Sequence, residues 1–400
     1  MKKYVKRYGV TIILVILASL NLYKSLSLYA HADYPYDARN VFLAGKIWLK
    51  GNNPYNDSLI KSEWNTFVST HQTWSKKPPG FPDCGMIYPF WSIPELIAFY
   101  ILPWEFGARQ LIWFISWLAL FGIAFFAYKA FKSRINFFTI LLLLLAFKSG
   151  AVALALGQPM LISICALLGC WYFYLKNKHL AAAFLLGIAA LKVTLCFPFI
   201  ILFLVHKNWK LLIVSSIIPA ICALSFYAVS GNFFLTEMLA NMGHQMQINY
   251  AGHILTAVNT NLTELGILFN YFFGVNYSSA AMLSLTFWAI GTLALIVAYL
   301  HKTITSNHFM ALLIVLNFLT SYHLIYDCIL LIFVIPVFTS IPTGKRLWLG
   351  LGILAPFFLP INGIFKSINW LQFHLPITLL GLFLYLIYDC YSKYRNNAVV

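Results

Sequence analysis

Repeated apolar runs of about 17–25 residues constrain the fold of this chain more than any other feature of its 400 residues. Each run can cross a bilayer as an α-helix, in which every backbone polar group finds a partner within the segment. Hydrophobic residues make up 61% of the chain and charged residues 10%, whereas soluble domains have about 45–50% and 25%. A membrane β-barrel would instead show alternating segments of about ten residues. The sequence therefore predicts an all-α, polytopic transmembrane helical bundle.

The net charge of +16 does not indicate a nucleic-acid partner, because the basic residues are unevenly distributed. Of the 27 Lys and Arg residues, 16 fall in short loops or tails that we assign to one side of the membrane. This is the pattern of the positive-inside rule. The residues are Lys2, Lys3, Lys6, Arg7, Lys129, Lys132, Arg134, Lys176, Lys178, Lys207, Lys210, Lys302, Lys345, Arg346, Lys393 and Arg395. We therefore expect an inner (plasma) membrane protein with both termini in the cytoplasm.

The acidic residues are concentrated on the other side of the membrane. Seven of the 11 lie between the first and second spans, and Glu237 and Glu264 lie in a second polar loop. The seven are Asp33, Asp37, Asp57, Glu63, Asp83, Glu95 and Glu105. Chemistry that needs carboxylates is thus expected on the outer face. Seven scattered cysteines without a CxxC motif are read as small apolar core residues, and we expect no obligatory disulfide.

The predicted topology is a single membrane domain over residues 1–400 with ten spans. Long outer loops are expected at about 30–105 and 230–275. The spans are expected at about 10–29, 108–128, 136–155, 159–175, 211–229, 279–300, 307–322, 325–341, 347–363 and 372–391.

Residues 180–205 do not fit the regular alternation of spans. Only about 26 residues separate the basic loops KNKH and HKNWK, which is too short for two full spans. A single span here would place one of these loops outside and break the charge pattern. We therefore predict a short helical hairpin with its tip near Lys192 to Phe197.

The stretch from Asp37 to Tyr55, DARNVFLAGKIWLKGNNPY, opens the first outer loop. Pro35 suits the first turn of a helix, which we expect to run to Lys50 before the turn Gly51–Pro54. Asp37 would then lie in the first turn, where the helix dipole favours a carboxylate. Farther along the loop, residues 86–103 are apolar but carry three prolines. They predict a membrane-surface or partly inserted helix instead of a full span.

Ionisable side chains within the spans are costly and often functional. Lys148 lies in the outer half of its helix and Lys192 at the tip of the hairpin. His323 and Asp327 are four residues apart and share one helix face. For the lysines the alternative is snorkelling to the interface, and for His323–Asp327 it is a purely structural pair. Gln158, in the turn LGQPM, could equally serve helix capping or packing.

Together, several cations and one acid are expected at the same outer membrane boundary. This arrangement suits a lipid-linked phosphate, because cations hold the anionic head and a carboxylate accepts a proton from an attacking hydroxyl. A non-catalytic transporter or flippase of lipid-linked sugar is the alternative. Transporters usually carry acids near mid-depth and internal repeats, whereas here Asp327 is the only acid near mid-depth of a span and no repeat is visible.

Three pieces of sequence resemble glycosyltransferase family 87, which comprises polytopic enzymes of GT-C type. The first is Asp37 and Ala44 followed by the pattern G-x-x-P-Y at 51–55. The second is the stretch 155–210, with its GQ, LLGIAALK and closing aromatic-basic loop in the family's order. The third is SYHLIYDCILLI at 321–332. The chain departs from the family at Phe90, where a second proline is usual, and at Val193, where a proline usually follows the lysine.

This resemblance implies transfer of a hexose, by family frequency mannose, from a polyprenyl-phosphate donor to a glycolipid or glycan acceptor on the outer face. It implies direct inverting attack with Asp37 as the general base, for which Asp33 is the competitor. His323 and Lys192 would bind the phosphate, with Lys148 or Arg39 assisting. Gln158 would touch the donor or the acceptor. We expect no nucleotide cofactor, because no glycine-rich loop is present, and no required metal, because no His/Cys ligand spacing is present.

Overall fold

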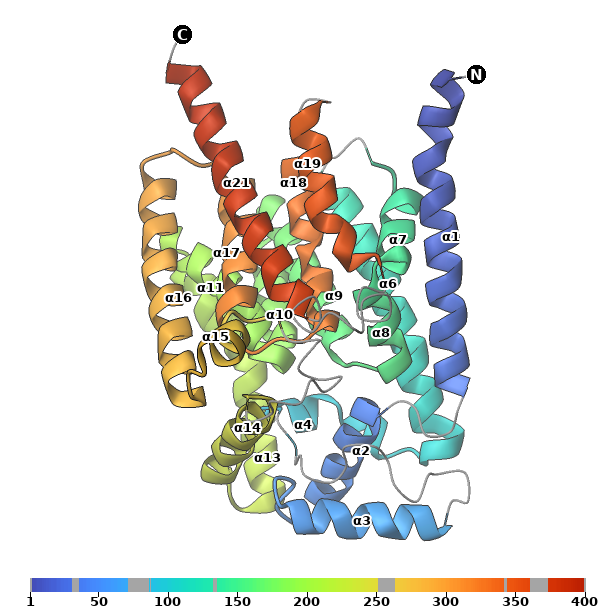
Figure 1. Ribbon diagram of the computed structural model, residues 1–400. Coiled ribbons are helices and arrows are strands. Elements are labelled where there is room, and N and C mark those ends of the chain that lie inside the picture. The colour runs from blue at the N-terminus through green and yellow to red at the C-terminus, as the bar shows by residue number, and fades with distance from the viewer. Residues whose placement is uncertain are drawn as a thin grey trace.

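The computed structural model describes residues 2–30, 36–70, 86, 88–131, 135–250, 263–341, 344–359 and 373–398. Within these ranges the regular structure is helical throughout (Figure 1). The first half contains α1 (Lys2–Ala30), α2 (Tyr36–Leu49), α3 (Asp57–Thr70), α4 (Ser92–Glu95), α5 (Ile97–Tyr100), η1 (Trp104–Ala108), α6 (Arg109–Phe131), α7 (Phe137–Ala146), α8 (Lys148–Leu156), α9 (Met160–Leu175), α10 (His179–Ala189), η2 (Ala190–Lys192) and α11 (Val193–Val205). The second half contains α12 (Trp209–Ser215), α13 (Ile217–Ser230), α14 (Leu235–Tyr250), α15 (Gly266–Phe273), α16 (Tyr277–Leu300), α17 (Ser306–Thr320), η4 (Ile325–Val334), α18 (Ile335–Thr339), α19 (Lys345–Leu354), η5 (Ala355–Phe357) and α21 (His374–Ala398).

The helices form a long bundle with a smaller layer at one end. Figure 1 shows both termini at one end of the bundle and α2, α3, α4 and α14 gathered at the opposite end. Each part has its own hydrophobic core. One core joins the bundle helices from α6 to α21. The other joins α2, α3, α5 and η1 with Leu191 of η2 and Phe226 of α13.

The described helices agree with the expected polytopic membrane bundle. Six described helical segments are long and apolar enough to cross a membrane, or up to seven if α7 and α8 count as one span. They are Thr11–Ala30, Arg109–Phe131, His179–Val205, Trp209–Ser230, Ser278–Leu300 and His374–Lys393. His179–Val205 meets this test by length and composition only, because contacts bring its two ends together. Four shorter apolar helices coincide with parts of the remaining expected spans. The total of ten spans stays a prediction.

The segment expected as one span at 136–155 is broken. α7 and α8 meet at Phe147 with a bend of 72°, and Phe147 is extended, with ψ 123°. Gly150 allows this bend, because a Cβ there would lie 2.3 Å from the carbonyl oxygen of Leu144. Another local departure is at 325–334, where η4 is a 3₁₀-helix before α18.

Contacts at both ends of residues 179–205 show the predicted hairpin. A straight helix of this length would span about 40 Å. However, Tyr174 at the end of α9 stacks on His206 and makes an edge contact with His179. Asn208 also contacts His179, since Asn208 Nδ2 lies 3.4 Å from His179 Nδ1. The chain must therefore reverse direction at η2, where Lys192 leaves helical geometry with φ −126° and ψ 82°.

The helix expected from Pro35 to Lys50 is observed as α2, with Asp37 in its first turn. It ends at Gly51, whose φ of +75° is natural only for glycine. Gly45 lets α5 approach, because a Cβ there would lie 2.2 Å from the ring of Tyr100. At the C-terminal end of α2, Trp48 stacks on Phe226 and donates to the Phe226 carbonyl oxygen at 3.1 Å. These contacts fix α2, and with it Asp37, against the end of the bundle.

The described part of 86–103 forms the short helices α4 and α5 and no full span, as expected. Trp91 anchors it to the hairpin tip by donating from Nε1 to the Ala190 carbonyl oxygen at 2.9 Å. Glu95 is the anomaly of this segment. Both of its carboxylate oxygens are buried, and neither has a hydrogen-bond partner among the described residues. Burial raises the pKa of Glu95 to about 8, so the group is a neutral acid at pH 7.

Replacing Glu95 by glutamine is expected to stabilise the protein at pH 8 and leave its stability unchanged at pH 4. Below its ordinary pKa of 4.5 the group is protonated whether the chain is folded or unfolded. Above 4.5 only the unfolded chain ionises freely, so the cost of burying Glu95 grows with pH until about 8. The rise in pKa corresponds to at most about 5 kcal/mol. Thermal unfolding in detergent at the two pH values measures this difference, and an equal gain at both would contradict it.

A candidate site for a lipid-linked phosphate

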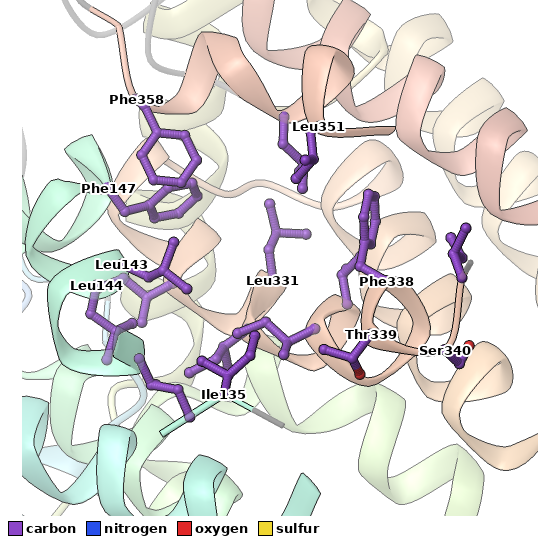
Figure 2. Close-up of a pocket in the computed structure, with 17 residues that line it drawn as sticks. Ile135, Leu143, Leu144, Phe147, Leu331, Phe338, Thr339, Ser340, Leu351 and Phe358 are labelled. Carbon is purple, nitrogen blue, oxygen red and sulfur yellow. The ribbon is translucent and has the colours of Figure 1, made fainter. Parts of the chain in front are cut away.

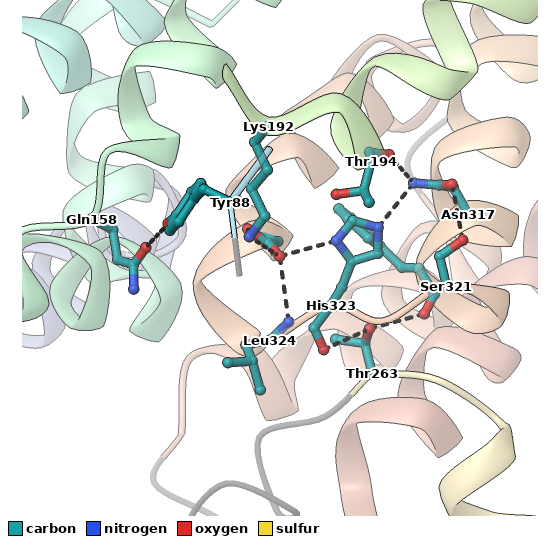
Figure 3. Close-up of polar contacts among 11 residues, drawn as sticks. Tyr88, Gln158, Lys192, Thr194, Thr263, Asn317, Ser321, His323 and Leu324 are labelled. Carbon is teal, nitrogen blue, oxygen red and sulfur yellow. Dashed lines mark hydrogen bonds and ion pairs between the residues drawn. The ribbon is translucent and has the colours of Figure 1, made fainter. Parts of the chain in front are cut away.

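The centre of the candidate site is an ion pair between the hairpin tip and the start of η4. Lys192 Nζ lies 2.7 Å from Asp327 Oδ1 and 2.8 Å from Oδ2 (Figure 3). The Asp327 side chain is fully buried, whereas that of Lys192 is 18% exposed. Tyr326 lies beside it, with its ring centroid 5.0 Å from Lys192 Nζ. The aspartate is thus enclosed, and the lysine is the member of the pair that an outside ligand can reach.

A chain of hydrogen bonds holds Asp327 from the side away from Lys192. Asn317 Nδ2 donates to the Thr194 carbonyl oxygen at 2.9 Å and to His323 Nε2 at 3.0 Å. Since Nε2 accepts, the ring proton is assigned to Nδ1, which donates to Asp327 Oδ2 at 2.9 Å. His323 is therefore neutral, and its side chain is fully buried with both nitrogens occupied. This arrangement makes His323 a positioning residue for Asp327.

The backbone around His323 is held by the segment that precedes α15. Thr263 N donates to the His323 carbonyl oxygen at 3.2 Å, and Thr263 Oγ1 donates to that of Phe318 at 2.9 Å. Farther along, Leu324 N lies 3.4 Å from Asp327 Oδ2. A carboxylate that accepts from the first turn of a helix satisfies an otherwise unpaired N–H and the helix dipole. Asp327 therefore also stabilises the start of η4.

Asp37 approaches this ion pair from the outer layer. It is partly buried at the start of α2, and no hydrogen bond or ion pair joins it to another described residue. Burial raises the pKa of Asp37 to about 6, the charge of Lys192 opposes that rise, and the charge of Asp327 adds to it. The charges of both members of the pair thus affect the pKa of Asp37, while no other described residue pairs with its carboxylate. Such a group can accept a proton near neutral pH.

Tyr88 links the outer layer, the ion pair and Gln158. Its hydroxyl donates to Gln158 Oε1 at 3.1 Å, and its carbonyl oxygen accepts from Tyr55 Oη at 2.9 Å. Figure 3 shows the Tyr88 ring between Gln158 and Lys192. Burial and the charges of Asp37 and Asp327 raise the pKa of Tyr88 well above its ordinary value, so it stays a neutral donor. Gly157, with φ +60°, ends α8 and presents Gln158.

A cavity of about 390 Å³ opens beside Lys192. Tyr88, Lys192 and Thr194 line its polar end, and Phe197, Leu285 and Trp288 line an apolar end between α11 and α16. Its volume lies within the range of about 300–1,000 Å³ that is usual for ligand pockets. The cavity thus combines the cation of Lys192, the carboxylate of Glu264 and an apolar wall. Among the described residues, no group of three or more His, Cys, Asp and Glu side chains could hold a metal ion.

A second, larger cavity of about 890 Å³ lies between α7, η4, α18 and α19 (Figure 2). Its lining is apolar apart from the hydroxyls of Thr339 and Ser340 at one edge, and it includes no charged side chain. Nothing in that lining could neutralise a phosphate. The candidate site is therefore the smaller cavity.

The structure brings together Asp37, Lys192, His323 and Asp327, with Gln158 joined through Tyr88. It describes no contact between this cluster and Lys148, which begins α8. Arg39 is two positions from Asp37 on α2 and fully buried, with its guanidinium 4.5 Å from the ring centroid of Trp64 in α3. Roles of Lys148 and Arg39 in phosphate binding stay predictions. The competing base Asp33, together with Asp83 and Cys84, lies outside the described residues.

Sequence reasoning did not identify Asn317, Thr263 or the structural role of Tyr88. Asn317 carried a usable signal, because it is a lone amide within the apolar run ALLIVLNFLT, and buried polar groups in spans need partners. Thr263 lies in a polar loop and Tyr88 in the apolar stretch 86–103, and in both places these residue types are common. No family model, curated protein or solved structure matches this chain, so its likeness to glycosyltransferase family 87 rests on the motifs quoted above.

Proposed function

We propose that this protein is a glycosyltransferase that moves a hexose from a polyprenyl-phosphate donor to an acceptor hydroxyl. The observation that carries the proposal is the position of Asp37, which lies within electrostatic reach of Lys192 and whose carboxylate makes no hydrogen bond or ion pair with another described residue. A base close to a phosphate-binding cation supplies the two groups that this chemistry needs. By resemblance the sugar is mannose.

The reaction is a single displacement. The acceptor oxygen attacks the anomeric carbon, the bond from that carbon to the phosphate oxygen breaks, and the configuration inverts. Asp37 takes the hydroxyl proton, and polyprenyl phosphate leaves with the bonding electrons. Because the phosphate is already a good leaving group, it needs charge neutralisation more than a second acid. This agrees with a base, Asp37, and a cation, Lys192, that lie near each other.

The hydrogen-bond inventory of Lys192 limits how it can act. An ammonium group has three N–H donors, and the two oxygens of Asp327 accept two of them. One donor is left for a phosphate oxygen at the cavity, where a charge-assisted bond is short and strong. Asp327 holds the ammonium in place, and Asn317 and His323 hold Asp327. The site is therefore built to position one cation accurately.

The proposed orientation places this site on the outer face of the plasma membrane with both termini in the cytoplasm. The common position of the two termini and the opposite position of α2 support it (Figure 1). The concentration of basic residues in the loops assigned to the cytoplasm agrees with this orientation.

Sugar transfer by the purified protein in proteoliposomes tests the proposal. The donors are radiolabelled polyprenyl-phosphate mannose, the corresponding glucose lipid and a nucleotide-linked mannose, with a lipid extract of the cells that make the protein as acceptor. We expect transfer from a polyprenyl-phosphate sugar only, with inversion at the anomeric carbon. Movement of the intact labelled lipid between leaflets without transfer would replace the enzyme by the flippase alternative.

A further inference from the structure

The apolar end of the smaller cavity has a shape that the proposed chemistry does not require. Ala281, Ser284, Leu285 and Trp288 recur at helical spacing on one stripe of α16 and face this cavity. Across it, Phe197 of α11 meets Trp288, with ring centroids 6.3 Å apart. The space beside Lys192 thus continues as a narrow apolar passage between α11 and α16.

The passage contains hydroxyls without partners. Ser284 is 5% exposed, and its Oγ has no hydrogen-bond partner among the described residues. The Oγ1 of Thr194, which is two residues from Lys192, is also buried and has no hydrogen-bond partner among the described residues. Serine and threonine in helices commonly satisfy their hydroxyls on the preceding turn, and a buried hydroxyl without a partner costs free energy. Two such groups on opposite walls of one cavity indicate a polar ligand between them.

The far side of α16 indicates where the passage leads. Ile290 lies nine positions after Ala281, about half a turn away round the helix, and is 65% exposed. In a membrane bundle an exposed apolar face of this kind contacts lipid tails. A chain that leaves the cavity between α11 and α16 therefore enters the hydrocarbon of the bilayer.

We propose that this passage holds the first part of the apolar chain of a polyprenyl phosphate, which enters sideways between α11 and α16. The phosphate lies at Lys192, the hydroxyls of Thr194 and Ser284 hydrogen-bond to the polar head, and the chain continues past Trp288 into the membrane. A cavity of about 390 Å³ has room for the head but not for a long chain, so the chain must leave it. This inference rests on the proposed function for the identity of the lipid.

A photoreactive polyprenyl phosphate without sugar tests the path of the chain. The probe carries a diazirine on the isoprene unit nearest the phosphate and is mixed with the full-length protein in nanodiscs. We expect cross-links in α11 and α16, competed by unlabelled polyprenyl phosphate. Neutral polyprenol should compete at least about tenfold more weakly, since it lacks the charge that Lys192 binds.

Two variants and one control localise the binding. Ala281→Trp fills the passage and should reduce cross-linking by tenfold or more. Ser284→Ala, which removes only a hydroxyl, should weaken competition by unlabelled polyprenyl phosphate by about tenfold. Ile290→Trp makes the same insertion as Ala281→Trp on the lipid-facing side of the same helix and should change nothing.

The outcomes separate this inference from the proposed function. Cross-links confined to α7, α18 and α19, or equal competition by diacyl phosphatidic acid, would overturn the lateral passage even if sugar transfer is observed. Cross-links in α11 and α16 that Ala281→Trp abolishes, in a protein that transfers no sugar, would keep the lipid passage and remove the glycosyltransferase.

Discussion

Replacing Asp37 by asparagine is expected to lower sugar transfer by about 10²–10⁴-fold and to leave donor binding within about threefold. Asparagine keeps the size and the helix position of Asp37 but cannot accept the hydroxyl proton. Donor binding should persist because Lys192, and not Asp37, faces the phosphate. The two effects are measured separately, by single-turnover transfer and by binding of the sugar-free polyprenyl phosphate.

The same residue should set the pH dependence of the wild-type enzyme. A general base works only when ionised, and the pKa of Asp37 is about 6. We expect kcat/KM to fall about tenfold for each pH unit below 6 and to level off above about pH 7. Bound donor adds a negative phosphate nearby, which disfavours ionisation of Asp37. The midpoint for kcat should therefore lie at a higher pH than the midpoint for kcat/KM.

The residual kcat/KM of the Asp37→Asn variant should not change with pH over the same range. Glu63→Gln is a matched control, because Glu63 is another outer-layer carboxylate, in an ion pair with the exposed Lys50. Such pairs contribute little to stability, so this variant should keep both the rate and the pH profile. If Asp37→Asn retained a third of the wild-type rate or an unchanged profile, Asp37 would not be the base.

The position of Asp37 could be predicted from sequence because the signals that place it are local. A proline before the helix, an acid in its first turn and the turn Gly51–Pro54 at its end act within about twenty residues of one another. The hairpin at 180–205 could also be predicted, because the spacing of two basic loops and the thickness of a bilayer leave only one arrangement. Both inferences needed no knowledge of the tertiary packing.

The partner of Lys192 could not be predicted in this way. The sequence indicates His323 and Asp327 as a pair because they are four residues apart, and that pair is observed. The bidentate contact of Asp327 with Lys192 joins residues 135 positions apart, and no local pattern specifies it. The 3₁₀ geometry of η4 is similar, since its sequence IYDCILLIFV reads as an ordinary apolar helix. This 3₁₀ geometry is seen only in the folded structure, in which Lys192 and His323 hold Asp327.

Breaking the Lys192–Asp327 pair from its two sides is expected to give opposite effects on ligand binding. Lys192→Met removes the only cation that the structure describes in the lining of the smaller cavity. Binding of polyprenyl phosphate should weaken by about 10–100-fold, as for the loss of a charged hydrogen bond. Asp327→Asn instead releases donors of Lys192 and makes the site more positive by one charge. Binding of the anion should then be retained or tightened, while transfer slows because the ammonium is no longer held in place.

These variants should rank differently in stability than in affinity for polyprenyl phosphate. Lys192→Met leaves the fully buried carboxylate of Asp327 without its counter-ion, which costs about 3–5 kcal/mol. Asp327→Asn should cost less, because Lys192 is partly exposed and can be hydrated. The double variant Lys192→Met/Asp327→Asn should recover most of the stability lost in Lys192→Met and none of its binding. Thermal unfolding and probe binding on the four proteins form a complete double-mutant cycle.

A control variant shows whether these effects belong to the site. Asp389→Asn removes a fully buried carboxylate that pairs with His308 at 2.9 Å between α21 and α17. This carboxylate also forms an ion pair with Lys393 at 3.0 Å, and none of these three residues lines the smaller cavity. Its stability should fall, but its affinity for polyprenyl phosphate should not change. If Asp327→Asn and Lys192→Met weakened binding equally, the pair would serve only to hold the fold, and Lys192 would not be the phosphate ligand.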